Sequence, residues 1–122
     1  MKTAELAGAA LDWAVAKCEG LNKDCGLLFI GTQAFETQWN SGERKLFCPS
    51  TDWEQGGLII EKLAGFELKI WLESNPETRC ETHIHNNEGN WIAFGPTPLV
   101  AAMRCYVASK LGVEIEIPKE IT

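Results

Sequence analysis

Residues 95–112, GPTPLVAAMRCYVASKLG, carry the strongest structural signal in the chain. Thr97 is expected to cap a helix, Pro98 supplies the fixed backbone angle of its first turn, and Gly112 ends it. Nearly every direction around this helix is apolar, which predicts a helix buried on almost all sides. Such a helix must be covered by other elements, so the neighbouring sequence is expected to supply a sheet and further helices.

An antiparallel meander is expected directly before this helix, over residues 66–95. Residues 66–73 alternate apolar and polar side chains, which is the period-two pattern of a half-buried strand. Asn75-Pro76 and the polar cluster 86–90 are typical turn sequences. The three strands are expected at residues 66–73, 78–85 and 91–95.

Two more helices and three short strands complete the prediction. The first helix is expected to begin at Thr3 and to end at Gly20, and the second to begin with the capping box Thr51-Asp52-Trp53-Glu54 and to end at Ala64. The short strands are expected at residues 27–30, 35–39 and 113–117. The predicted fold class is α+β, with one mostly antiparallel sheet (the meander 66–95 plus the C-terminal strand) and about three helices packed on it.

Composition restricts the class of protein. The 122 residues are enough for one domain with its own core, and 45% hydrophobic residues with 23% charged ones are typical of a soluble globular protein. The net charge of −6 argues against duplex nucleic acid as a partner, because phosphate binding needs clustered basic residues. No apolar run approaches the ~20 residues that span a bilayer. Five cysteines without Cys-x-x-Cys spacing indicate free thiols in a reducing compartment, with Cys48 the thiol to test for reactivity.

Arg104 is the first candidate functional residue. It lies in the middle of the apolar helix, where an unpaired guanidinium would be very costly to bury. The planar guanidinium suits a phosphate or carboxylate ligand. The alternative is an internal salt bridge to one of the 17 acidic residues.

Two helix starts are further candidates for ligand binding. Thr97 begins a helix whose N-terminal N–H groups attract anions, although a rigid turn explains the flanking prolines equally well. The segment 50–57 combines polar groups, an indole and two glycines that suit a flat ring with a polar edge, or a close helix contact. Its candidate binding residues are Ser50, Thr51, Asp52, Trp53, Gly56 and Gly57.

Glu81, His83 and His85 alternate along one predicted strand, so their side chains project from one face. Two histidines at this spacing and a carboxylate are able to share a metal ion, which would serve a metal-dependent hydrolase. A solvated polar face is the simpler interpretation. We assign no catalytic residue and expect no cofactor.

Three blocks of the sequence, residues 5–20, 48–57 and 94–112, resemble the NinX-like family of small phage proteins from the nin region of lambdoid phages. The resemblance implies a phage origin and a location in the host cytoplasm. Small phage accessory proteins often bind something of the host's, including nucleotide signals of antiviral defence.

The leading hypothesis is therefore a non-enzymatic binder that sequesters a small anionic or nucleotide-derived ligand. In this hypothesis Arg104 and the helix start at Thr97 hold phosphates, and Trp53 with Asp52 holds a base. Exposed Trp71 would support a homo-oligomer. The alternative is an inhibitor that covers a basic site on a host enzyme with an acidic surface, formed by the strand face and the loop 40–50.

Overall fold

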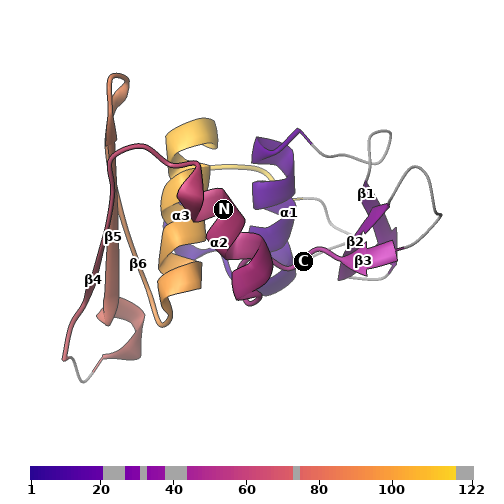
Figure 1. Cartoon of the computed structure of the whole chain (residues 1–122), viewed down its shortest axis with the longest axis horizontal. Coiled ribbons are helices and arrows are strands. Elements are labelled where there is room, and N and C mark those ends of the chain that lie inside the picture. Colours follow the sequence, from indigo (N-terminus) through magenta and orange to yellow (C-terminus); the bar gives the residue numbers. More distant parts are fainter. Residues whose placement is uncertain (21–26, 31–32, 38–43, 73–74, 118–122) are drawn as a thin grey trace.

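The computed structural model describes residues 1–20, 27–30, 33–37, 44–72 and 75–117, and it places the helices between two three-stranded sheets (Figure 1). One sheet has the strand order β1-β2-β3 and the other β4-β5-β6, and every pairing is antiparallel. The elements in chain order are η1 (Thr3–Glu5), α1 (Gly8–Cys18), β1 (Leu27–Ile30), β2 (Gln33–Thr37), β3 (Arg44–Leu46), α2 (Trp53–Glu61), β4 (Phe66–Ile70), η2 (Pro76–Thr78), β5 (Cys80–Asn86), β6 (Gly89–Gly95) and α3 (Pro98–Leu111).

The expected meander and the helix that follows it are confirmed. β5 is the central strand, with Thr82 opposite Leu68 of β4 on one side and Ala93 of β6 on the other. Thr97 caps α3 by accepting a hydrogen bond of 3.1 Å from the Val100 N–H. The fold class is α+β, as the antiparallel meander with helices packed on it predicted.

α3 lies against the inner face of the β4-β5-β6 sheet and is buried on almost every side. The hydroxyl of Thr82, which is fully buried, donates a hydrogen bond of 2.8 Å to the Ala101 carbonyl. A Cβ atom on Gly95 would lie 2.9 Å from the Ala101 nitrogen, so only glycine lets β6 approach the helix this closely. The buried α3 residues are Leu99, Ala101, Ala102, Met103, Arg104, Cys105, Tyr106 and Val107.

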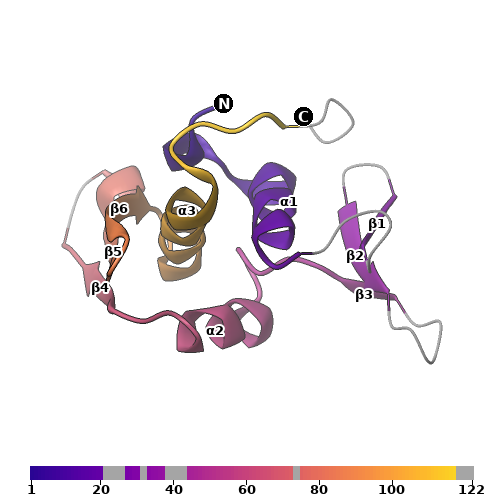
Figure 2. The ribbon, with the colours of Figure 1, turned by 90° about the horizontal axis from the view of Figure 1, so that it is seen from above.

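α1 packs on the opposite side of α3, and α2 crosses beside the pair (Figure 2). The core therefore lies between α1, α3 and the inner face of the β4-β5-β6 sheet, where Leu11, Met103 and Ile84 belong to one buried cluster. The β1-β2-β3 sheet lies beyond α1, on the far side from α3 (Figure 2). The helices thus form a central layer instead of covering one face of a single sheet.

The prediction of a single sheet with a C-terminal strand was wrong. β1, β2 and β3 form a sheet of their own, and residues 38–39 of the weak strand expected at 35–39 lie outside the described residues. The segment 113–117 forms only an isolated bridge between Glu114 and Lys2. The alternating pattern predicts a strand, but the segment pairs with residues 1–3 at the start of the chain and not with the edge of a sheet.

Two helix starts also differ from the prediction. Thr3 does not cap α1, because its hydroxyl donates to the Gly112 carbonyl at 2.8 Å and α1 begins only at Gly8. Asp52, and not Thr51, caps α2, by accepting from the Glu54 N–H at 3.0 Å. Both helices end earlier than predicted, since α1 ends at Cys18 and α2 at Glu61. Thr and Asp are both good N-cap residues, and the sequence alone does not decide which of two neighbours adopts the backbone angles of the cap.

Candidate functional site

A cavity of about 340 Å³ lies where the start of the chain, β6, α3 and the segment after α3 meet. The antiparallel bridge between Lys2 and Glu114 holds its two outer walls together. The Thr3 N–H reinforces this bridge through a hydrogen bond of 2.9 Å to the Val113 carbonyl. The residues that line the cavity are Lys2, Thr3, Ala4, Ile92, Ala93, Arg104, Ala108, Val113 and Glu114.

Arg104 lines this cavity from α3 and is only 6% exposed. Its Nε donates a hydrogen bond of 2.7 Å to the Leu6 carbonyl, and its Nη1 donates one of 2.8 Å to the Phe94 carbonyl. The guanidinium therefore links the turn before α1 to the end of β6 and satisfies two main-chain acceptors. This position explains how a basic side chain is accommodated in an otherwise apolar helix.

The nearest carboxylate approaches Arg104 from the surface. Oε2 of Glu77 lies 3.5 Å from Nη1 of Arg104, and the Glu77 side chain is 66% exposed. Within the described residues, Nη2 of Arg104 makes no hydrogen bond. The internal partners of Arg104 are thus mainly main-chain carbonyl groups and not the acidic side chain that the sequence predicted, and Nη2 keeps donors that are unused in the described part of the chain.

The other predicted ligand-binding residues lie elsewhere. Thr97 uses its hydroxyl oxygen to cap α3, and it does not line the Arg104 cavity. The segment 50–57 is also absent from the lining, so the structure does not bring its residues and Arg104 into one site.

Within the segment 50–57, the side chains have mostly structural roles. Asp52 accepts from the Glu54 N–H and, at 3.0 Å, from the Gln55 side-chain amide. A Cβ atom on Gly56 would lie 2.4 Å from the Pro49 carbonyl oxygen, whereas one on Gly57 would meet nothing within 4 Å. Trp53 is 57% exposed. The glycine at position 56 thus serves close packing, which was the simpler of the two interpretations.

The sequence did not single out Asp12, which the structure places against this segment. Its Oδ1 accepts a hydrogen bond of 2.9 Å from the Ser50 N–H, and its side chain is buried. Burial raises the pKa of Asp12 to about 6, and the Ser50 hydrogen bond opposes that rise. The apolar spacing of α1 gave no indication that a carboxylate would face inward.

Glu81, His83 and His85 follow one another on the outer face of β5, as predicted. Nε2 of His83 and Oε2 of Glu81 lie 2.5 Å apart, and this hydrogen bond lowers the pKa of Glu81. Nδ1 of His85 contacts Oδ1 of Asn90 instead. In the described part of the chain, no three His, Cys, Asp or Glu side chains are arranged to hold a metal ion. The geometry therefore does not assemble the metal site considered from the sequence.

The thiols of Cys18 and Cys105 face the core. Burial raises the pKa of Cys18 to about 12 and that of Cys105 to about 11, so neither thiolate is populated at neutral pH. Cys48 is partly exposed and lies near Gln55, whose amide nitrogen is 3.8 Å from Sγ.

Residues 40–43 of the loop expected to form an inhibitory surface lie outside the described residues.

Comparison with known proteins identifies a family and a solved structure with a similar fold. A family model described as "Bacteriophage P22, NinX" matches residues 2–110. A crystal structure of a phage protein from Bacillus cereus ATCC 14579 matches with a TM-score of 0.60 and 16% sequence identity, over 95% of this chain and 93% of that chain. At this identity, the likeness concerns the fold. Comparison with curated proteins gave no match.

None of the helices in the described ranges has the length and apolar character needed to cross a membrane.

Proposed function

The chain belongs to the NinX family of bacteriophage P22, and from this we propose that it is a phage accessory protein that sequesters a small anionic or nucleotide-derived ligand in the host cytoplasm. The observation that carries the proposal is the Arg104 guanidinium, which is nine-tenths buried and lines a cavity while Nη2 has no hydrogen bond in the described part of the chain. In this proposal, the ligand is a host antiviral defence signal.

The chemistry of the cavity supports an anionic ligand with an apolar part. Arg104 and Lys2 bring two positive charges to the lining, against one negative charge from Glu114. Arg104 offers N–H donors to a phosphate or carboxylate, and such charge-assisted hydrogen bonds are among the strongest in proteins. Ile92 and Val113 offer apolar contact to the rest of the ligand.

The size of the cavity favours a small ligand. Its volume of about 340 Å³ lies at the lower end of the roughly 300–1,000 Å³ that small-molecule sites occupy. The net charge of −6 is compatible with this, because charges farther than about 10 Å from the ligand are screened at cellular ionic strength. The proposal places the ligand at Arg104, Lys2 and Thr3, and leaves the segment 50–57 with its structural roles.

The test is thermal denaturation with inorganic phosphate, pyrophosphate, AMP and a cyclic dinucleotide as probes. A probe that binds only the folded protein stabilises it by about 2.7 kcal/mol at a concentration 100 times its Kd, and this raises the melting temperature. Native mass spectrometry of protein from infected, defence-positive cells complements this by detecting a retained molecule. We expect a melting shift with at least one probe.

Two variants locate the binding. Lys2→Ala removes a charge from the lining, and Ala108→Leu fills part of the cavity. We expect either change to reduce the melting shift, while Lys110→Ala, an exposed lysine that does not line the cavity, leaves it unchanged. No shift with any probe, together with a purified protein that retains only a host polypeptide, would contradict the proposal and favour an inhibitor of a host protein.

A further inference from the structure

We propose that the free edge of β4 pairs with β4 of a second copy of this chain, so that two β4-β5-β6 sheets join into one six-stranded sheet across a two-fold axis at Leu68. This inference does not rest on the proposed ligand, because no residue of β4 lines the Arg104 cavity. It rests on the backbone of β4, on the side chains that the edge exposes and on the order of its charges.

The backbone of β4 presents hydrogen-bonding groups to its free edge. The Trp71 N–H donates to the Arg79 carbonyl at 2.7 Å, and the His85 N–H donates to the Gly65 carbonyl at 3.0 Å. In an antiparallel pair, hydrogen-bonded positions alternate, so the odd-numbered residues of β4 bond to β5. The N–H and C=O groups of Phe66, Leu68 and Ile70 therefore point away from β5, toward an edge at which no further strand lies among the described residues.

The edge strand β4 and the residue two positions after it expose apolar side chains. Leu68 is 38% exposed and Ile70 59% exposed, and Leu72 just beyond the strand has no cover at all. Natural edge strands are usually protected against pairing by being short, by charges or by proline, and an exposed apolar edge marks a pairing site. α3 covers the inner face of β5 and β6 but leaves these β4 side chains largely open.

The sequence of β4 is self-complementary about Leu68. Phe66-Glu67-Leu68-Lys69-Ile70 reads apolar, acidic, apolar, basic, apolar. Two antiparallel copies centred on Leu68 place Phe66 opposite Ile70, Leu68 opposite its own copy, and Ile70 opposite Phe66. Each of these three pairs consists of edge-facing residues and is able to exchange two main-chain hydrogen bonds.

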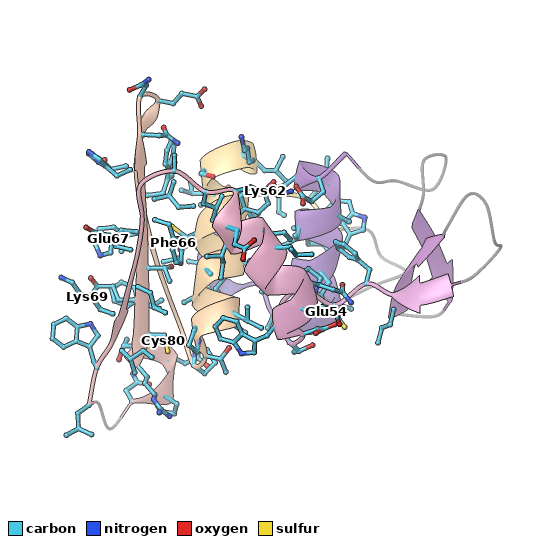
Figure 3. The ribbon with its side chains drawn as sticks, in the orientation of Figure 1. Glu54, Lys62, Phe66, Glu67, Lys69 and Cys80 are labelled. Carbon is cyan, nitrogen blue, oxygen red and sulfur yellow. The ribbon has the colours of Figure 1, made fainter. Side chains whose placement is uncertain are left out.

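The same register brings opposite charges together. Glu67 and Lys69 lie on the outer face of β4, away from α3, whereas Phe66 lies on the side of α3 (Figure 3). In the proposed pairing, each Glu67 faces Lys69 of the other copy at a non-hydrogen-bonded position, where side chains are closest. Moving the axis by one residue in either direction places two Glu67 or two Lys69 side chains opposite each other. Charge thus selects the register centred on Leu68.

The experiment is sedimentation equilibrium of the full chain, with two charge variants that are complementary to each other. We expect the wild-type protein to sediment at twice its mass of 13.5 kDa. Glu67→Lys and Lys69→Glu each place like charges opposite each other twice, which should weaken self-association about 10- to 100-fold. An equimolar mixture of the two variants should form a heterodimer, because opposite charges then meet again at both positions.

A control and a backbone variant complete the test. Lys110→Glu makes the same charge change as Lys69→Glu at an exposed position of α3, and it should remain dimeric. Leu68→Pro removes an N–H that faces the free edge and none that bonds to β5, so it should be a folded monomer by circular dichroism. A monomeric wild-type chain, whether or not its edge takes up a segment of another protein, overturns the proposal. So does a dimer that both charge variants and Leu68→Pro leave intact.

Discussion

The backbone N–H of Ser50 donates a hydrogen bond of 2.9 Å to Oδ1 of Asp12 and thereby ties the loop before α2 to the middle of α1. Asp12 is buried, and Ser50 is buried beside it. A carboxylate in this place is able to act as an acceptor in either protonation state, but burial penalises its charged form. The relationship therefore links the stability of the fold to pH.

Asp12→Asn should make the protein more stable at neutral pH. The pKa of Asp12 rises from 3.8 to about 6 on folding, so the folded state binds the proton more tightly than the unfolded state. The protonated Asp12 therefore contributes about 3 kcal/mol to the free energy of unfolding below pH 3.8, and this contribution is lost as the pH rises through about 6. Urea unfolding of both proteins from pH 4 to 8 should show the variant gaining relative to wild type as the pH rises. A difference that does not change with pH would show that Asp12 does not titrate in this range.

Gly56→Ala and Gly57→Ala should have opposite effects on stability. The Cβ atom at position 56 would meet the Pro49 carbonyl oxygen at 2.4 Å, so α2 must shift, at a cost of roughly 2 kcal/mol. The Cβ atom at position 57 meets nothing within 4 Å, and alanine there should stabilise α2 by up to about 1 kcal/mol. Denaturant midpoints of the two variants provide the measurement. Equal effects would contradict the packing of Gly56.

Arg104→Ala should destabilise the fold by roughly 3 kcal/mol. The change leaves the Leu6 carbonyl, which is buried, and the Phe94 carbonyl, which is partly buried, without their Arg104 donor, and a buried group left unsatisfied costs about 1–3 kcal/mol. The matched control is Arg79→Ala, since the Arg79 side chain is exposed, and it should stay within about 0.5 kcal/mol of wild type. Chemical denaturation without any ligand measures this structural role. An Arg104→Ala protein as stable as the control would show that the two carbonyl contacts contribute nothing.

Asp52→Ala should cost more than Thr51→Ala, although the sequence first indicated Thr51 as the cap of α2. Asp52 accepts the Glu54 N–H, and its loss should reduce stability by about 1 kcal/mol. The Thr51 hydroxyl donates a long hydrogen bond of 3.4 Å to the Cys48 carbonyl, and its loss should cost less than about 0.5 kcal/mol. Thermal melts of both variants at one pH decide between the two caps, and the reverse order would restore Thr51.

Local patterns predicted the half of the chain that folds through short-range contacts. The alternation in residues 66–72 and the turn cluster before β6 fixed the meander, because strands joined by tight turns pair with their neighbours in sequence. Thr97, Pro98 and Gly112 fixed the bounds of α3. The segment 113–117 was predicted wrongly, because period-two alternation shows only that one face of the segment is covered, and here Ile115 and Ile117 pack against the core without a described strand beside them.

The candidate site was only partly visible from the sequence. A single arginine in an apolar helix indicated that position 104 needed partners, but not that these would be the carbonyls of Leu6 and Phe94. Main-chain acceptors carry no sequence signature, so a pattern of side chains cannot reveal them. Lys2 and Val113 were not predicted as neighbours of Arg104 either, because the segments that meet at the cavity are distant in sequence.

The amino-acid order on its own determined the type and position of most elements and the self-complementary charges of β4, since these depend on residue spacing along one element. Only the tertiary structure decided that the strands divide into two sheets, that the helices lie between them, that Asp12 meets Ser50 and that Arg104 lines a cavity. Each of those outcomes depends on contacts between distant segments, whose energies are set by packing and burial and not by local preference.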